Sequence, residues 1–71
     1  MEELKNIGEE IRKRRKMLGI IQPELADIAG VSLRSLIEIE NGTGNPTLIQ
    51  IMKVLDALGL KINIRPKYEF D

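Results

Sequence analysis

The stretch Gln22-Pro-Glu-Leu-Ala-Asp-Ile-Ala-Gly-Val-Ser-Leu-Arg-Ser-Leu-Ile-Glu-Ile-Glu-Asn-Gly42 decides the fold of this chain. Pro23 stands where the first turn of a helix does not need a backbone N–H. Gly30 supplies the positive φ of a sharp turn, and Ser32 is a favourable N-cap for a second helix. The stretch therefore predicts two short helices, at 22–29 and 33–40, joined by a tight turn.

Longer helices are expected on both sides of this pair. Apolar residues recur at helical spacing before Gly19 and after Thr47, which predicts helices over 3–18 and 48–58. Thr47 is suited to cap the later helix, and Gly19 and Gly59 are suited to end the two helices. The residues expected to face the core are Leu4, Ile7, Ile11, Leu18, Leu25, Ile28, Ala29, Val31, Leu36, Ile39, Leu48, Ile51, Met52, Leu55 and Leu58.

After Gly59 the apolar period changes from helical to strand-like. Leu60, Ile62 and Ile64 alternate with polar residues, which predicts a β-strand. A lone strand leaves backbone groups unpaired along its edges. Pairing with the same strand of a second copy is therefore expected, and packing as an irregular tail is the alternative. The expected divisions are a helical domain at 1–59, a dimerisation strand at 60–66 and a tail at 67–71.

The composition of the 71-residue chain argues against several classes of protein. The chain contains neither Cys nor His, which removes disulfides, the commonest zinc ligand and the commonest general base. Because no nucleophile–base constellation or phosphate loop is visible, we expect no enzyme, cofactor or metal site. No segment approaches the roughly 20 apolar residues of a membrane span, and no signal peptide is visible. We therefore expect a cytoplasmic protein without a membrane partner.

A pair of short helices joined in this way indicates DNA binding, because the second helix of such a pair enters the major groove. The net charge of the chain does not favour DNA binding. The chain has 11 basic and 11 acidic residues, whereas nucleic-acid-binding domains are commonly basic. The run of five cations at 12–16 is either a solvated helix face or a patch that faces phosphates.

Four residues on the second helix have competing interpretations. Arg34, the only cation of that helix, either reads guanine with two parallel hydrogen bonds or pairs with Glu38 at i+4. Glu38 accepts from cytosine, repels incorrect sites or is simply solvated. Leu33 and Ile37 contact thymine methyl groups, bind a protein partner or extend the core.

Residues 7–59 resemble the XRE helix-turn-helix family, which includes phage repressors and Cro. The residues that carry the resemblance are Ile11, Arg15, Gly19, Gln22, Leu25-Ala26, Gly30-Val31-Ser32, Ile39-Glu40-Asn41-Gly42, Asn45-Pro46 and Leu58-Gly59. The resemblance implies an all-α fold, a compact four-helix domain of the lambda-repressor type. The terminal strand is similar to that of HipB-type antitoxins, in which it pairs with its copy in the second subunit.

The resemblance also implies roles for individual residues. Arg15 and Glu40 match the family's internal ion pair between the first helix and the end of the third. Dimerisation through the terminal strand would use Leu60, Ile62 and Ile64. The residues implied in DNA contacts are Gln22, Ser32, Leu33, Arg34, Ser35, Glu38, Thr43 and Asn45.

Together these features predict a homodimeric regulator, most simply a repressor, that binds a palindromic operator in double-stranded DNA. The HipB-type resemblance adds the role of antitoxin to a HipA-like toxin. The alternative is a protein-binding adaptor that holds a toxin or kinase-like partner, with DNA binding secondary.

Overall fold

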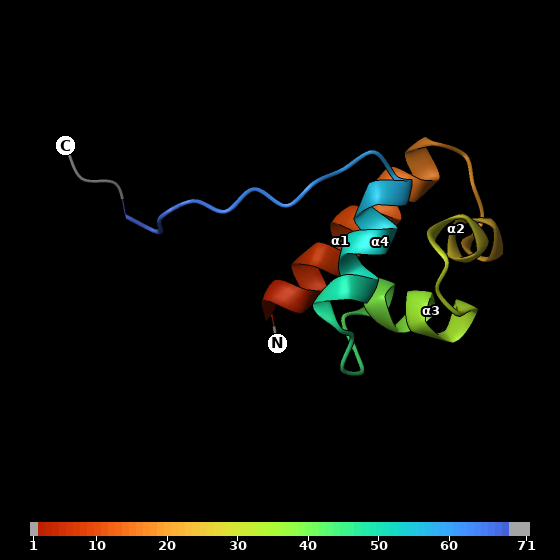
Figure 1. Ribbon diagram of the computed structural model, residues 1–71, viewed down its shortest axis with the longest axis horizontal. Coiled ribbons are helices and arrows are strands. Elements are labelled where there is room, and N and C mark those ends of the chain that lie inside the picture. The colour runs from red at the N-terminus through yellow and green to blue at the C-terminus, as the bar shows by residue number, and fades with distance from the viewer. Residues whose placement is uncertain (1, 69–71) are drawn as a thin grey trace.

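A computed structural model of the chain describes residues 2–68, and four helices make up most of this range (Figure 1). The helices are α1 (Glu2–Met17), α2 (Gln22–Ala29), α3 (Leu33–Asn41) and α4 (Leu48–Ala57). Their ends agree with the predicted ranges to within one residue. α3 packs against each of the other three helices, and α2 also packs against α4. The predicted all-α, four-helix fold is therefore confirmed.

Side-chain caps fix where α3 and α4 begin. The Ser32 hydroxyl accepts the Ser35 N–H at 3.0 Å and so caps α3. Thr47 and Gln50 form a reciprocal pair at the start of α4, in which each side chain accepts the other residue's N–H at 3.0–3.1 Å. The turn between α2 and α3 has its left-handed residue at Gly30, with φ +74°. These local signals determine where α2 ends and where α3 and α4 begin.

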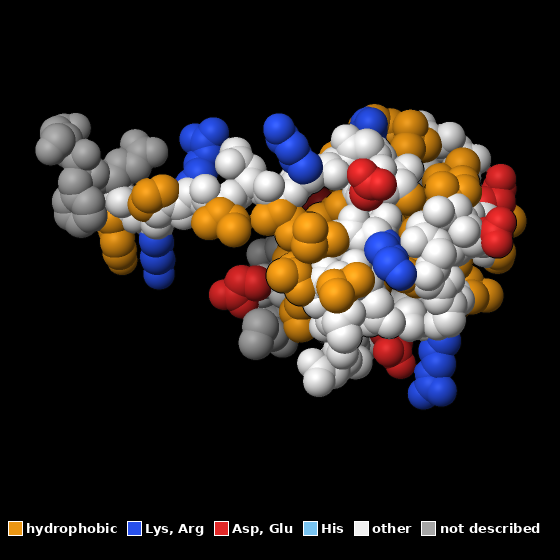
Figure 2. Space-filling model, in the orientation of Figure 1, with side chains coloured by type: hydrophobic (Ala, Val, Ile, Leu, Met, Phe, Trp, Pro, Cys, Tyr) orange, Lys and Arg blue, Asp and Glu red, His pale blue; other side chains and the backbone are white. Residues whose placement is uncertain are grey.

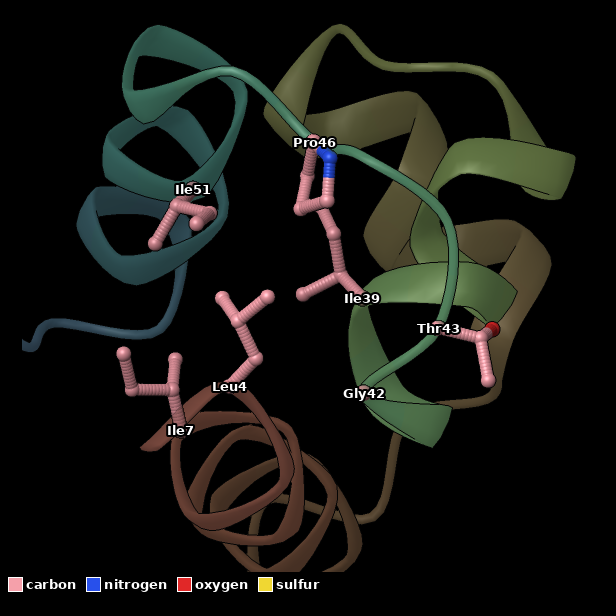
Figure 3. Close-up of a pocket in the computed structure, with 7 residues that line it drawn as sticks. All are labelled: Leu4, Ile7, Ile39, Gly42, Thr43, Pro46 and Ile51. Carbon is pink, nitrogen blue, oxygen red and sulfur yellow. The ribbon is translucent and has the colours of Figure 1, made fainter. Parts of the chain in front are cut away.

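The core is aliphatic and lies where the four helices meet. It consists of Ile11, Leu25, Ala26, Ala29, Leu36, Ile39, Ile51, Val54 and Leu58. At one end, side chains from α1, α3, α4 and the loop before α4 close a small recess (Figure 3). Leu4, Ile39 and Pro46 point toward one another there, whereas Thr43 points away. The recess leaves no room for a water-sized sphere, so this end of the core is filled.

Gly8 allows α1 to approach the end of α3 more closely than any side chain would permit. A Cβ atom at this position would collide with the Ile39 carbonyl oxygen and would lie 2.6 Å from that of Glu40. The sequence pattern gave no reason to single out this glycine, because it lies inside a helix and only the packing partner reveals its role.

Several residues expected in the core are instead exposed. Ile28 and Leu48 are each 63% exposed, Met52 is 51%, Leu18 is 46% and Ile7 is 38%. A prediction from helical spacing alone assigned too many apolar residues to the buried face of each helix. In α2 the buried residues centre on Leu25, Ala26 and Ala29, and Ile28 lies roughly 100° round the helix from them.

The predicted C-terminal β-strand is wrong for the single chain. Within residues 2–68 no strand is formed, and the segment 60–66 leaves the body as an extended chain (Figure 1). A strand requires the backbone groups of a neighbouring extended segment, and the rest of the described chain offers helices and their connections. Leu60 is half-buried, whereas Ile62 and Ile64 are exposed. Of the predicted tail at 67–71, residues 69–71 lie outside the described residues, as does residue 1.

None of the helices in this range is long and apolar enough to cross a bilayer.

Candidate nucleic-acid interface

The outward face of α3 combines one cation with two aliphatic side chains. The Arg34 side chain is 89% exposed, and Leu33 and Ile37 are 42% and 36% exposed. Leu36 and Ile39 occupy the opposite face and are buried. Leu33 and Ile37 therefore do not extend the core. They stand beside Arg34 on the surface, and contact with DNA or with a protein partner stays a prediction for both.

Glu38 restrains Arg34 from one turn further along α3. Its Oε1 lies 3.5 Å from Arg34 Nε, and its side chain is 38% exposed. The loop after α3 passes close to the same carboxylate, because a Cβ at Gly44 would lie 2.5 Å from Glu38 Oε2. The guanidinium thus has a weak surface partner that it can leave.

The other residues implied in DNA contacts lie around this face in different environments. Ser32 is exposed and Ser35 half-buried, with their hydroxyls 2.8 Å apart. Thr43 and Asn45 are exposed in the loop between α3 and α4, and the Thr43 N–H donates to the Glu38 carbonyl at 3.0 Å. Figure 1 places this loop beside the end of α3. The structure therefore gathers these positions at α3 and the loop that follows it.

Glu40, at the C-terminal end of α3, is the centre of a buried charge network. Glu40 is only 1% exposed. Arg15 donates to it twice, at 2.7 Å from Nε to Oε2 and at 3.0 Å from Nη2 to Oε1. Arg12 Nε and Gln22 Nε2 also donate to Oε1, at 3.3 and 3.1 Å. The Arg15–Glu40 pair that the resemblance implied is present, and Arg12 and Gln22 are additional members.

The network sets the protonation of Glu40. Burial raises the pKa of this carboxyl, but hydrogen bonds from Arg15, Gln22 and Arg12, together with the positive charge of Arg15, more than offset that effect. The net result is a pKa below the ordinary value for glutamate. The hydrogen bond to Glu40 correspondingly raises the pKa of Arg15. Glu40 is therefore ionised at neutral pH, and its charge is neutralised inside the domain rather than presented to DNA.

Gln22 lies at the start of α2, but its side-chain amide points into this network. The residue is half-buried, and its Nε2 atom donates to Glu40. The N-cap residue Ile21 has no side-chain acceptor; its own N–H donates instead to the Glu24 carboxylate at 3.3 Å. The direct DNA contact implied for Gln22 therefore competes with an internal hydrogen bond.

The basic run at 12–16 is largely used inside the molecule. Arg12 donates to Asn41 Oδ1 at 2.6 Å as well as to Glu40. Arg14 Nε donates to the Leu58 carbonyl at 3.0 Å, and Arg15 Nη1 donates to that of Ile20, also at 3.0 Å. These arginines join α1 to the end of α3, to the end of α4 and to the connection between α1 and α2. The two interpretations of this run, a solvated helix face and a patch that faces phosphates, both missed these internal hydrogen bonds.

Several known proteins that are similar to this chain in sequence carry the names of transcriptional regulators or repressors. The helix-turn-helix family matches residues 11–64. The phage repressor RstR of Vibrio cholerae is 37% identical over 57 residues, which cover 80% of this chain and 51% of the repressor. A protein of Methanothermobacter thermautotrophicus, named as an uncharacterized HTH-type transcriptional regulator, is 43% identical over 49 residues, covering 69% of this chain and 71% of the relative. The chain thus spans about half the length of RstR.

A solved structure shares the fold. The restriction-modification controller protein C.AhdI from Aeromonas hydrophila superimposes with a TM-score of 0.78 and 28% sequence identity. The match covers 86% of this chain and 92% of C.AhdI. The four-helix arrangement, the turn at Gly30 and the match over residues 11–64 agree on one assignment. This chain belongs to the XRE-type helix-turn-helix family.

Proposed function

We propose that this protein is a DNA-binding transcriptional regulator, most simply a repressor, that inserts the outward face of α3 into the major groove. The observation that carries the proposal is the exposed cluster of Arg34, Leu33 and Ile37 on the second helix of the two-helix unit. A groove helix needs donors for base edges and apolar groups for thymine methyls, and this face has both. The names of RstR and of the HTH-type regulator support the same function.

Arg34 is the residue to which we assign base recognition. Its guanidinium can give two parallel hydrogen bonds to guanine O6 and N7. Glu38 holds it near the helix at 3.5 Å, and a surface pair of this kind contributes little free energy, so the exchange for a base costs little. Ser32, Ser35, Thr43 and Asn45 surround the reading face and are suited to phosphate contacts, which position a protein rather than specify a sequence.

The buried network supports this function indirectly. Glu40 joins the end of α3 to α1 through Arg15 and to the start of α2 through Gln22. It thereby fixes the angle between the two helices of the DNA-binding unit. Because Glu40 is neutralised internally, one of the four acids in the 22–45 region adds no repulsion toward phosphates.

A homodimer on a palindromic operator completes the proposal. Two copies related by a two-fold axis would place their α3 helices in successive major grooves, roughly 34–36 Å apart. The segment 60–66, with Leu60, Ile62 and Ile64 on one side, is the part of the chain that would pair with its copy. The relatives reported above carry the names of a repressor, a regulator and a restriction-modification controller. We therefore attach neither an antitoxin role nor a HipA-like partner to this proposal.

A selection of random DNA duplexes with the full chain tests this function, repeated at two salt concentrations. A palindromic consensus is expected. Affinity for that consensus should fall roughly 100-fold between 50 and 200 mM salt if about four phosphates are contacted. A selection without a consensus, combined with affinity that ignores salt, would refute DNA recognition. It would favour the adaptor alternative, for which Leu33 and Ile37 would be partner contacts.

A further inference from the structure

A groove of about 500 Å³ lies between α1 and α4 at the root of the C-terminal segment. Its apolar lining consists of Ile7, Leu48, Ile51, Leu55, Leu60 and Ile62. Its polar lining consists of Asn6, Glu10 and Lys61. Figure 2 shows hydrophobic side chains gathered on the body where the C-terminal segment leaves it. α1 packs mainly on α3 and α4 mainly on α2, and α1 and α4 make little direct contact with each other.

The chemistry of the groove suits an aliphatic chain segment. Leu48 is 63% exposed and Ile7 is 38% exposed, although both are large and apolar. Contiguous exposed aliphatic groups on a small soluble domain usually mark a surface that another chain covers. Polar groups stand at only three positions of the lining, so most of the surface that an occupant would contact is aliphatic.

The C-terminal segment has the matching composition. Leu60, Ile62 and Ile64 alternate with polar residues, so an extended chain presents them on one side. Leu60 and Ile62 begin along the groove of their own chain, but Ile64 is 89% exposed. The segment therefore carries Ile64 past the groove and into solvent, although this side chain is large and apolar.

Charge also favours an exchange of this segment between copies. Residues 60–68 contain three cations, Lys61, Arg65 and Lys67, and no acid. Residues 2–10, at the start of α1, contain four acids and one lysine. Glu10 of this acidic half lines the groove directly. A basic extended segment from a second copy would thus meet an apolar floor and, at its edge, the Glu10 carboxylate.

We propose that the α1–α4 groove of each copy receives residues 60–65 of a second copy of this chain. Ile62 and Ile64 of the incoming segment occupy the groove, and its Lys61 lies at the other copy's Glu10. The inference rests on the homodimer of the proposed function and adds the surface on which the exchanged segment sits. In Figure 1 the segment leaves the body on the side away from α2 and α3, so a dimer built here leaves the outward face of α3 free.

The apolar half of the proposal is tested by sedimentation velocity of the full chain without DNA. Wild type should sediment as a dimer at micromolar concentration, and Leu48→Asp should sediment as a monomer. Ile49→Asp is the matched control, since Ile49 is 67% exposed and does not line the groove. Both changes put an acid into the first turn of α4, where the helix dipole favours it, so neither should unfold the chain. Equal sedimentation of the two variants as dimers would overturn the groove as the interface.

The exchange itself is tested by reversing charges. Glu10→Lys and Lys61→Glu, each alone, should weaken self-association roughly 10-fold, because each homodimer then contains two like-charge contacts. A mixture of the two variants should associate as tightly as wild type, since the heterodimer regains both opposite-charge contacts. Glu9→Lys in place of Glu10→Lys should give no such rescue. If the mixture stays as weak as its components, the segment does not cross between copies.

These outcomes separate this inference from the proposed function. A dimer that ignores the groove variants but selects a palindrome would overturn the groove contact alone. A groove-dependent dimer that selects no DNA sequence would overturn the regulator and leave the interface standing.

Discussion

Replacing Arg15 with alanine tests whether the Glu40 network holds the DNA-binding unit together. Arg15 is 9% exposed and Glu40 is 1% exposed, so the truncation leaves a buried carboxylate without its principal partner. Two hydrogen bonds to Glu40 are lost, at 2.7 and 3.0 Å, together with the 3.0 Å bond to the Ile20 carbonyl. Arg12 and Gln22 still donate to Glu40, at 3.3 and 3.1 Å, but their contacts are longer and Gln22 is uncharged.

The expected cost is about 3–5 kcal/mol, the range for removing one partner of a buried ion pair. A domain of this size has a total free energy of unfolding of roughly 4–10 kcal/mol, so the variant should be close to unfolding at room temperature. Each kcal/mol shifts the melting temperature by about 4–8 °C in a domain of this size. The melting temperature should therefore fall by at least about 12 °C.

Arg12→Ala is the matched control on the same helix. The Arg12 side chain is 39% exposed and makes the longer, 3.3 Å contact to Glu40, so its removal should cost about 1 kcal/mol. Thermal unfolding followed by circular dichroism at pH 7 measures both variants. If Arg15→Ala melts no lower than Arg12→Ala, the network does not provide the stability assigned to it here.

Three further outcomes follow from the same contacts. Gly8→Ala should lower the free energy of unfolding by about 1–3 kcal/mol, because its Cβ would collide with the carbonyl oxygens of Ile39 and Glu40; a urea titration that matches wild type would contradict this close approach. Glu40→Gln should be less stable than wild type at pH 7. This difference should shrink as pH falls below about 4.3 and vanish below the folded-state pKa, since the pKa of Glu40 is lowered on folding; a constant difference down to pH 2 would exclude an ionised Glu40. Ser32→Ala should cost about 1 kcal/mol through loss of the α3 cap, and an unchanged denaturation midpoint would count against that cap.

The sequence predicted those features that depend on local backbone chemistry. Pro23, Gly30, Ser32 and Thr47 act on their own turn or helix end. The four helices begin and end within one residue of the predicted ranges. Features that depend on what lies opposite were harder to predict. The spacing of α2 could not show that Ile28 faces solvent, because a helix of eight residues has too few turns to define a narrow stripe.

The candidate site shows the same division. The outward face of α3 followed from the position of the turn, because the buried Leu36 and Ile39 leave Leu33, Arg34 and Ile37 outside. The internal hydrogen bonds of the basic run at 12–16 could not be predicted from the sequence pattern. Arg14 reaches the Leu58 carbonyl 44 residues away, and no short-range signal encodes such a contact. The terminal segment alternates apolar and polar residues like a strand, yet residues 2–68 offer it no neighbouring extended segment and it forms no strand there. The pattern therefore failed to predict the structure of this segment in a single copy.

Base recognition by Arg34 is tested most directly by titrating wild type and Arg34→Ala against the selected operator and its single-base variants. The side chain is 89% exposed, so the substitution should leave the melting temperature unchanged. We expect Arg34→Ala to lose about 1–3 kcal/mol of binding free energy on the operator, or roughly 5–150-fold in affinity, with relaxed preference at one base pair in each half-site. Equal affinity and an unchanged base preference in the variant would contradict it.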